Sequence, residues 1–152
     1  MKKVYQHILT TSEIEALEKV QINRSFKIYD DSPVFIFTII NKLKADFEFS
    51  LHKQSYWRVE QSSKGHPWHL DTGSNNHMMW CKIGCTMLLD GDFEGGETFY
   101  KKDNKEHIVQ REKYELLAHT SDEEHMVKPS VGNRKVLLLL SLIHISEPTR
   151  PY

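Results

Sequence analysis

Cysteine is scarce in this sequence, with only Cys81 and Cys85 among 152 residues. On one strand their Cα atoms would lie about 13 Å apart, which is too far for a disulfide between them. We therefore expect two core thiols in a reducing compartment. The N-terminus runs from Met1 into mixed polar sequence and shows no apolar signal segment, so the expected location is the cytoplasm.

Long apolar runs and an excess of charge of one sign are also missing. No run approaches the ~20 residues that a helix needs to cross a membrane. Twenty basic residues are balanced by 21 acidic ones, which gives no clear signal for binding nucleic acid or an anionic membrane. With 39% hydrophobic and 27% charged residues, the 152 residues suffice for one globular domain with a core, but not for two.

Two helices are expected in the N-terminal third. Thr10-Thr11-Ser12-Glu13 has the pattern of a capping box and predicts a short helix through about Val20. Asp30-Asp31-Ser32-Pro33 is a second helix start, although the apolar run that follows is β-branched and also suits a strand. The good cap favours a helix over about residues 33–45, with its apolar face packed on the outside of a sheet.

From Phe47 onward, apolar residues tend to alternate, which is typical of strands. A turn at residues 64–67 leads into a strand around His69, and residues 101–106 form a loop or hairpin tip. The other expected strands are residues 47–51, 56–60, 82–89, 97–100, 107–109, 114–118, 126–127 and 134–139. Two helices followed by about eight short strands imply a sheet sandwich or barrel with the helices against one face.

A His-x-Asp pair, His69 and Asp71, follows the turn at residues 64–67. Side chains two residues apart in a strand point to the same face, so this imidazole and carboxylate would project together. His125, in a downstream His-x-Val-x-Pro segment, would complete a 2-His-1-carboxylate site with open positions on a ferrous ion. His-x-Asp alone is weak evidence, because it is common as a surface pair on a turn. With the downstream motif and the arginine that follows it, Arg134, a metal site becomes the favoured interpretation.

With the Phe-Glu-Gly-Gly-Glu-Thr segment at residues 93–98 between them, these motifs resemble the 2-oxoglutarate- and Fe(II)-dependent dioxygenases of the prolyl-4-hydroxylase-like group. The resemblance covers roughly residues 55–139. It implies a mainly β fold with N-terminal helices, a double-stranded β-helix (jelly-roll, cupin-like barrel). It also implies Fe(II) held by His69, Asp71 and His125, with 2-oxoglutarate and O2 as co-substrates. The implied reaction is hydroxylation of a substrate, coupled to oxidative decarboxylation of 2-oxoglutarate to succinate and CO2.

The resemblance also assigns the co-substrate end of the site. Arg134 would anchor the distal carboxylate of 2-oxoglutarate, because a guanidinium pairs with a carboxylate through two parallel hydrogen bonds. The alternative is an edge arginine that is exposed to solvent or paired with a local glutamate. Where relatives often carry a tyrosine that touches the co-substrate, this sequence has Leu88, which leaves Thr86 as a candidate second contact. His119 is a rival third metal ligand, ranked below His125 because the spacing to the proline and to Arg134 fits the family only from His125.

Two other functional classes stay open. One is a cupin-like metal-binding protein that acts on a small molecule without oxygen activation and has no need for Arg134. The other is a non-catalytic binding barrel. Within the favoured class the sequence does not identify the prime substrate, for which a peptidyl proline, a free amino acid and another metabolite are all candidates.

The last residues differ from the rest of the chain. Residues 140–150 resemble the in-frame translation of a transposon-derived adapter used in sequencing libraries. We therefore expect a single dioxygenase domain over residues 1–139 and a non-native tail over residues 140–152, and we discount His144 as a ligand. Leu140, Leu142 and Ile143 are apolar enough to prolong the preceding strand, whereas Pro148 and Pro151 prevent residues 146–151 from continuing it.

Overall fold

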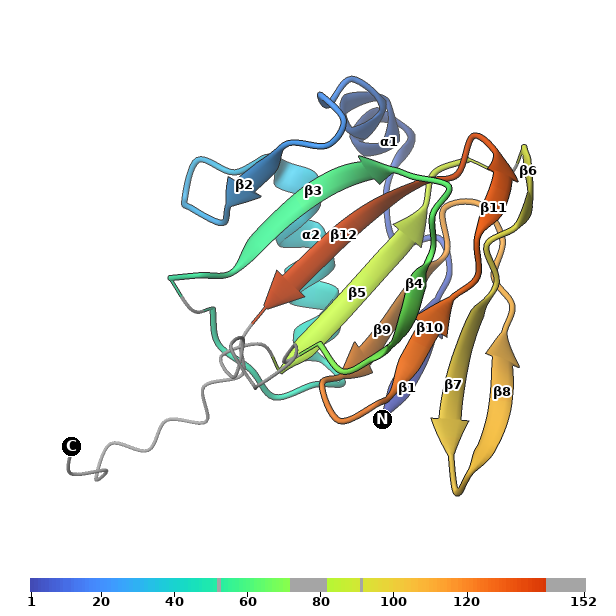
Figure 1. Cartoon of the computed structure of the whole chain (residues 1–152). Coiled ribbons are helices and arrows are strands. Elements are labelled where there is room, and N and C mark those ends of the chain that lie inside the picture. The colour runs from blue at the N-terminus through green and yellow to red at the C-terminus, as the bar shows by residue number, and fades with distance from the viewer. Residues whose placement is uncertain (52, 72–81, 91, 142–152) are drawn as a thin grey trace, which may run out of the picture.

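The structure is a computed structural model that describes residues 1–51, 53–71, 82–90 and 92–141. Helices and strands alternate near the N-terminus, and strands alone follow after α2 (Figure 1). The elements are β1 (Lys2–Tyr5), α1 (Thr11–Glu18), β2 (Ser25–Lys27), α2 (Val34–Lys44), β3 (Tyr56–Gln61), β4 (His66–His69), β5 (Ile83–Leu88), β6 (Phe93–Gly95), β7 (Thr98–Lys102), β8 (Lys105–Val109), β9 (Leu116–Thr120), β10 (His125–Val127), β11 (Ser130–Gly132) and β12 (Lys135–Ser141).

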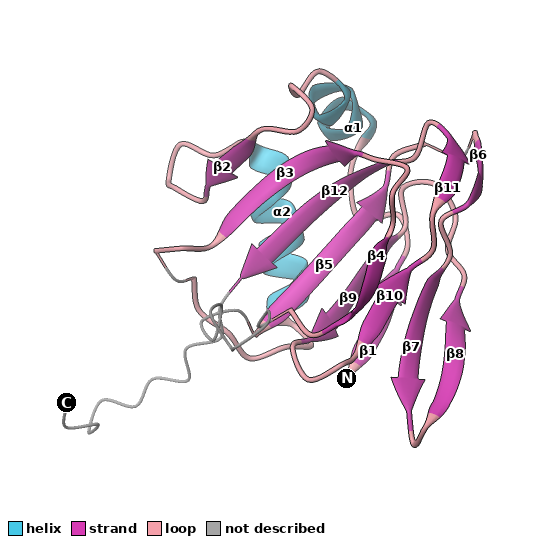
Figure 2. Ribbon diagram, in the orientation of Figure 1, coloured by secondary structure: helices cyan, strands magenta, loops and turns pink. Residues whose placement is uncertain are grey.

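The strands form antiparallel sheets, which Figure 2 shows with both helices behind the large one. The large sheet has the strand order β1-β9-β5-β12-β3-β2, and the smaller sheet has the order β4-β10-β7-β8. A short pair joins β11 to β6. Residues of both larger sheets line one cavity between them. This is the expected mainly β jelly-roll with two helices near the N-terminus.

Both helices form where the sequence predicts them. The side chain of Thr10 accepts a hydrogen bond from the backbone of Glu13, and the carboxylate of Glu13 accepts one from the backbone of Thr10, which closes the expected capping box. Pro33 occupies the N-cap of α2 and not its first helical position. The β-branched run is helical because its apolar residues recur at helical spacing and pack against the large sheet; the buried ones are Phe35, Ile36, Ile39, Ile40 and Leu43.

Alternation along the strands of the large sheet separates the core from the cavity. In β5, Ile83 and Met87 pack into the core beside the helices, whereas Gly84 and Thr86 line the cavity. Strands β3, β9 and β12 alternate in the same way. Their core residues are Trp57, Val59, Leu116, Ala118, Leu137 and Leu139. Their cavity residues are Tyr56, Arg58, Glu60, Leu117, His119, Val136 and Leu138. One face of this sheet therefore stabilises the fold while the other face supplies the walls of a site.

Several expectations about the strands need correction. Residues 47–51 are not a strand, since their alternating aromatics arise because Phe47 is buried and Phe49 packs partly against the core just after α2. Strands β1 and β2, which the sequence did not predict, flank the large sheet by pairing with β9 and β3. The hairpin tip after β7 is reduced to Asp103 and Asn104, both with positive φ, and is shorter than the expected loop at residues 101–106.

Strand β12 continues past residue 139, as expected. Leu140 pairs with both β3 and β5, and Ser141 pairs with β5. The expectations for Leu142, Ile143, His144 and residues 146–151 lie outside the described residues, as does Cys81. Cys85 is a buried thiol in the core, as expected. In the part of the chain that the structure describes, no helix is long and apolar enough to span a membrane.

Candidate active site

Two antiparallel strands of the small sheet bring the predicted metal ligands together. His69 ends β4 and lies directly opposite His125, the first residue of β10. Asp71 lies two residues beyond β4, in a turn and not in the strand itself, yet it reaches the same place. One ligand atom from each of the three side chains lies within 4.8 Å of the others. The structure thus groups the three residues that the sequence analysis selected.

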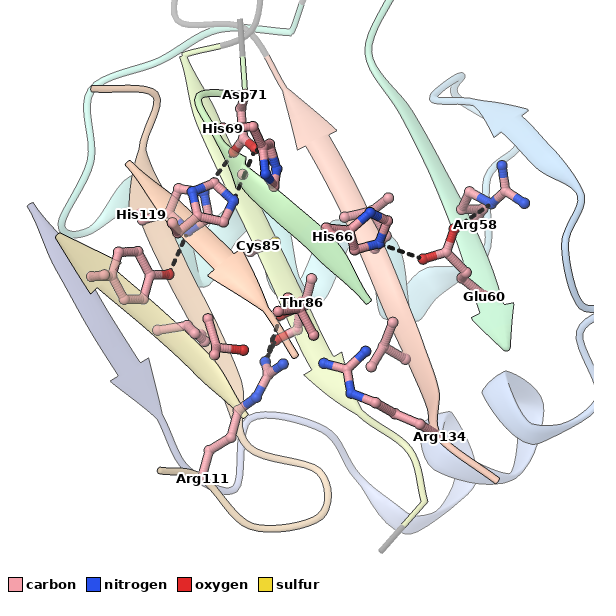
Figure 3. A pocket seen from close by; sticks show the side chains of 18 of the residues that line it. Arg58, Glu60, His66, His69, Asp71, Cys85, Thr86, Arg111, His119 and Arg134 are labelled. Carbon is pink, nitrogen blue, oxygen red and sulfur yellow. Dashed lines mark hydrogen bonds and ion pairs between the residues drawn. The ribbon is translucent and has the colours of Figure 1, made fainter. Parts of the chain in front are cut away.

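The two oxygens of the Asp71 carboxylate have different neighbours. Its Oδ1 lies 3.7 Å from Nε2 of His69 and 3.3 Å from Nε2 of His125. Its Oδ2 lies 2.5 Å from Nε2 of His119. One oxygen therefore faces the two histidines of the candidate metal site. The other is held from the side by His119, which Figure 3 shows beside Asp71.

The histidines opposite Oδ1 are oriented by backbone carbonyl groups. Nδ1 of His69 lies 2.7 Å from the carbonyl oxygen of Pro67, and Nδ1 of His125 lies 2.8 Å from that of Glu123. A carbonyl can only accept, so each Nδ1 carries the proton and, in the neutral ring, Nε2 keeps a lone pair for a metal. This orientation of ligand histidines by outer hydrogen bonds is common in metal sites. The donor set therefore fits a divalent metal such as Fe(II).

His119, the rival ligand, is buried beside this set but uses both of its ring nitrogens. Nδ1 lies 2.8 Å from the hydroxyl of Tyr100, and Nε2 faces Asp71. In a neutral ring, Nε2 would donate to the carboxylate and Nδ1 would accept from the tyrosine. This arrangement favours His119 as a residue that orients Asp71 and favours His125 as the third ligand.

Gly84 is a residue of this site that the sequence analysis missed. A Cβ atom at this position would lie 2.1 Å from Oδ2 of Asp71 and 3.0 Å from Nε2 of His119. The pair can approach the backbone of β5 only because no side chain is present there. A glycine inside an apolar strand often marks such a close approach, and this was the available signal.

The charges at this end of the cavity compensate one another. Burial alone would raise the pKa of Asp71, but hydrogen bonds from His119 and His125 outweigh it and hold that pKa far below its usual value. Burial lowers the pKa of His69, which keeps its ring neutral at pH 7. Burial also disfavours the charged form of His125, but the hydrogen bond and charge of Asp71, together with the carbonyl and charge of Glu123, outweigh this effect and raise its pKa. The carboxylate is thus ionised and partnered before any metal arrives.

The cavity continues from the histidines to two arginines and has a volume of about 240 Å³ (Figure 3). Arg134 precedes β12, is 9% exposed, and lines the cavity with Val136 and Leu138. Its Nε is buried without a hydrogen-bond partner among the described residues. Burial, partly opposed by the charge of Glu60, lowers the pKa of this guanidinium. The arginine is therefore a buried cavity residue and not the solvent-exposed edge residue of the alternative interpretation.

Thr86 also lines the cavity, but both of its oxygens are engaged by an arginine that the sequence analysis did not select. Nη1 of Arg111 lies 2.6 Å from the hydroxyl oxygen of Thr86 and 2.5 Å from its carbonyl oxygen. In the sequence Arg111 stands between polar and charged neighbours and looks like a solvated loop residue. Leu88, at the position of the relatives' tyrosine, is buried and has no polar group to offer.

The wall of the cavity that β3 and β4 form carries an ionic cluster. Nε2 of His66 lies 3.5 Å from the carboxylate of Glu60, and Nε of Arg58 lies 3.9 Å from it. The hydrogen bond from His66, more than the nearby arginine charges, holds the pKa of the half-buried Glu60 below its usual value. Trp68, the other residue near the ligand strand, stacks with the amine of Lys101 at 4.4 Å. Arg58, Glu60 and His66 line the cavity and make this wall polar, whereas Val136 and Leu138 make the β12 wall apolar.

Solved structures share this architecture. A prolyl-4-hydroxylase of Pseudomonas putida matches with a TM-score of 0.71 at 15% identity, over 97% of this chain and 87% of that one. The chain has the prolyl-4-hydroxylase fold. A prolyl hydroxylase of Trichoplax adhaerens, in complex with a hypoxia inducible factor oxygen degradation domain peptide fragment, matches with a TM-score of 0.64 at 14% identity, over 93% of this chain and 83% of that one.

An oxidoreductase of the 2OG-Fe(II) oxygenase family from Burkholderia pseudomallei matches with a TM-score of 0.54 at 14% identity, over 76% of this chain and 55% of that one. The sequence itself matches no family model and no curated protein sequence. Likeness at such low identity establishes the prolyl-4-hydroxylase fold, and the chemistry has to be argued from the side chains in the cavity.

Proposed function

We propose that the protein is an Fe(II)- and 2-oxoglutarate-dependent oxygenase that hydroxylates a substrate while 2-oxoglutarate is oxidatively decarboxylated to succinate and CO2. The observation that carries the proposal is the pairing of two sites in one cavity. A His-Asp-His cluster lies at one end, and a buried arginine without a carboxylate partner among the described residues lies at the other. A dicarboxylate with a keto group suits both ends at once.

At the metal end, His69, Asp71 and His125 would hold the ion through two neutral imidazoles and one carboxylate. With Fe(II) this set leaves one net positive charge, which the carboxylate of the co-substrate can offset. The bound iron supplies the activation of O2. The protein contributes the open coordination positions and, through the carbonyl oxygens of Pro67 and Glu123, the orientation of both imidazoles.

At the other end, Arg134 would hold the distal carboxylate of 2-oxoglutarate. The guanidinium stays charged when it is desolvated, and its planar fork matches a carboxylate. Val136 and Leu138 continue the same face of β12, so the co-substrate would lie along an apolar wall that limits access of water. Leaving this charge buried and unpaired costs several kcal/mol, which is a physical reason to expect an anionic ligand.

A cupin-like metal-binding protein that acts without oxygen is the alternative, and it has no need for the buried Arg134. A non-catalytic binding barrel would need neither the metal ligands nor the buried arginine. The experiment that separates the three functions is metal analysis of the purified protein, followed by measurement of succinate released from 2-oxoglutarate in air. The proposal predicts about one Fe(II) per chain and succinate formation that requires both Fe(II) and O2.

Iron binding without any succinate, across pools of candidate substrates, would favour the cupin-like protein instead. Absence of both iron binding and succinate formation would favour the non-catalytic barrel. Peptides that contain proline belong in the first pool, because a fold relative is known in complex with a peptide, and free amino acids and other metabolites follow. The Asp71→Ala variant is the matched control, since it should remove the metal and with it any succinate.

A further inference from the structure

The arginine end of the cavity carries two guanidinium groups, Arg134 and Arg111. They come from different parts of the fold, since Arg134 precedes β12 and Arg111 lies in the segment between β8 and β9. Figure 3 shows both side chains directed into the same end of the cavity, on either side of Thr86. Their placement is therefore a product of the tertiary fold and has no counterpart in a sequence motif.

In the described part of the chain, no carboxylate lies within ion-pair distance of either guanidinium, although the charge of Glu60 acts on Arg134 from farther away. Among the described residues, no ion pair within 4.0 Å involves Arg111 or Arg134. Burial, together with the charge of Arg134, lowers the pKa of Arg111 to about 10. Two like charges in one desolvated space repel each other, and an anion between them would remove that repulsion.

Thr86 fixes the direction of Arg111. An arginine has five N–H donors, of which two belong to Nη1. Nη1 contacts both the hydroxyl oxygen and the carbonyl oxygen of Thr86. In the described part of the chain, Nε and Nη2 have no hydrogen bond of their own. The guanidinium is thus held in place through one nitrogen while its remaining donors are left for another ligand.

We propose that Arg111 is a second carboxylate-binding residue, which holds the distal carboxylate of 2-oxoglutarate together with Arg134, and that Thr86 is the residue that positions it. This inference rests on the proposed function. Leu88 carries no polar group, whereas Arg111 directs charged donors from the segment between β8 and β9 into this end of the cavity. Thr86 then acts through Arg111 and does not itself bind the co-substrate.

The inference predicts selectivity for a charged distal group. 2-Oxopentanoate has the same chain length and the same keto acid end as 2-oxoglutarate, but a methyl group replaces the distal carboxylate. A residue that touches this carboxylate should discriminate between the two ligands, whereas a residue that only supports the fold should affect both alike. Titration of each ligand into the Fe(II)-loaded full chain without oxygen measures this difference independently of turnover.

The variants for this titration are Arg111→Gln, Arg111→Lys and Thr86→Val. Arg111→Gln should weaken 2-oxoglutarate about ten- to a hundredfold, as expected for loss of a charge-assisted contact, and leave 2-oxopentanoate within about twofold. Thr86→Val should weaken 2-oxoglutarate in the same selective way but less. Arg24→Gln is the matched control, because Arg24 is exposed just before β2 and outside the cavity lining, and it should leave both ligands unchanged.

Equal loss of both ligands in Arg111→Gln, or no loss of either, would overturn the role of Arg111 while leaving the proposed function intact. If the glutamine variant does not fold, as judged by its thermal melt, Arg111→Lys decides, because it keeps the charge and loses the fork. Selective weakening of 2-oxoglutarate in that variant supports the inference, and wild-type affinity for both ligands contradicts it. A wild-type protein that binds iron but not 2-oxoglutarate would overturn the proposed function, and the inference with it.

Discussion

The charges at the two ends of the cavity are balanced in different ways. At the metal end, the carboxylate of Asp71 is surrounded by three imidazoles, and both of its oxygens have partners. At the arginine end, Arg111 and Arg134 lie close enough to affect each other's charge and have no carboxylate partner among the described residues. The protein itself balances the charge at the metal end, whereas the charges at the arginine end depend on a ligand for their balance.

This difference explains how one cavity can be selective at both ends. Hydrogen bonds from the ligand histidines to backbone carbonyls, and from His119 to Asp71, preorganise the metal end, so little rearrangement is needed when an ion binds. The arginine end retains the cost of one buried charge, Arg134, and one partly buried charge, Arg111, until an anion arrives. A ligand present at about a hundred times its dissociation constant stabilises the folded state by about 2.7 kcal/mol. We therefore expect the co-substrate to raise the melting temperature of the metal-loaded protein.

The largest effect should follow removal of the Asp71 carboxylate at the metal end. Asp71→Ala deletes an anionic ligand and the charge that balances the ion, so iron binding should fall by at least about a hundredfold. A chelator competition assay measures this change. His125→Ala should give a comparable loss. If His119→Ala instead abolished iron binding while His125→Ala spared it, the ligand assignment would be wrong.

The next largest effect should come from the arginine end. Arg134→Gln keeps a hydrogen-bonding side chain but removes the charge and the fork. Its affinity for 2-oxoglutarate should fall by about 2–4 kcal/mol, or roughly thirty- to a thousandfold, with iron binding unchanged. Anaerobic titration gives both affinities. Equal 2-oxoglutarate affinity in the wild type and the variant would refute the anchor role.

A smaller effect is expected for the residue that supports Asp71 from the side. His119→Ala removes the hydrogen bond to Oδ2 and the link to Tyr100, so Asp71 is less well oriented. The variant should still bind about one Fe(II) per chain, with affinity lower by about tenfold, which is the lower end for loss of an outer-shell partner. An unchanged affinity would mean that Asp71 is held by the other histidines alone.

The smallest effect should come from a site outside the cavity. Thr10→Ala removes the hydroxyl of the capping box at the start of α1. The free energy of unfolding should fall by about 1 kcal/mol, as measured by urea denaturation. Iron and 2-oxoglutarate affinities should stay at their wild-type values. A change in either affinity would show that the helices, and not only the cavity walls, control the site.

The metal end was accessible from the sequence, because His69, Asp71 and His125 belong to local motifs whose spacing fits two paired strands. Arg134 could be selected for the same reason. Arg111 could not, since it lies between polar neighbours and its burial depends on how the segment between β8 and β9 folds over β5. The contact between Thr86 and this arginine is likewise a tertiary one.

The fold was predictable where patterns were strong. The capping box and the helical spacing of α2 identified both helices, but alternation alone misled at residues 47–51, where Phe47 and Phe49 pack against the core without any strand pairing. Strands β1 and β2 are short edge strands whose pairing depends on distant partners. Periodicity in one segment carries no information about such partners.

If one ligand bridges the two ends of the cavity, its affinity must depend on the metal. Anaerobic titration of 2-oxoglutarate into the protein with and without Fe(II) tests this dependence directly. A bridging ligand should bind at least about tenfold more tightly with the metal, because affinities of coupled sites change reciprocally. Asp71→Ala should lose this enhancement, whereas Arg134→Gln should retain it at a weaker overall affinity. Equal 2-oxoglutarate affinity with and without Fe(II) in the wild type would show that no ligand bridges the two ends.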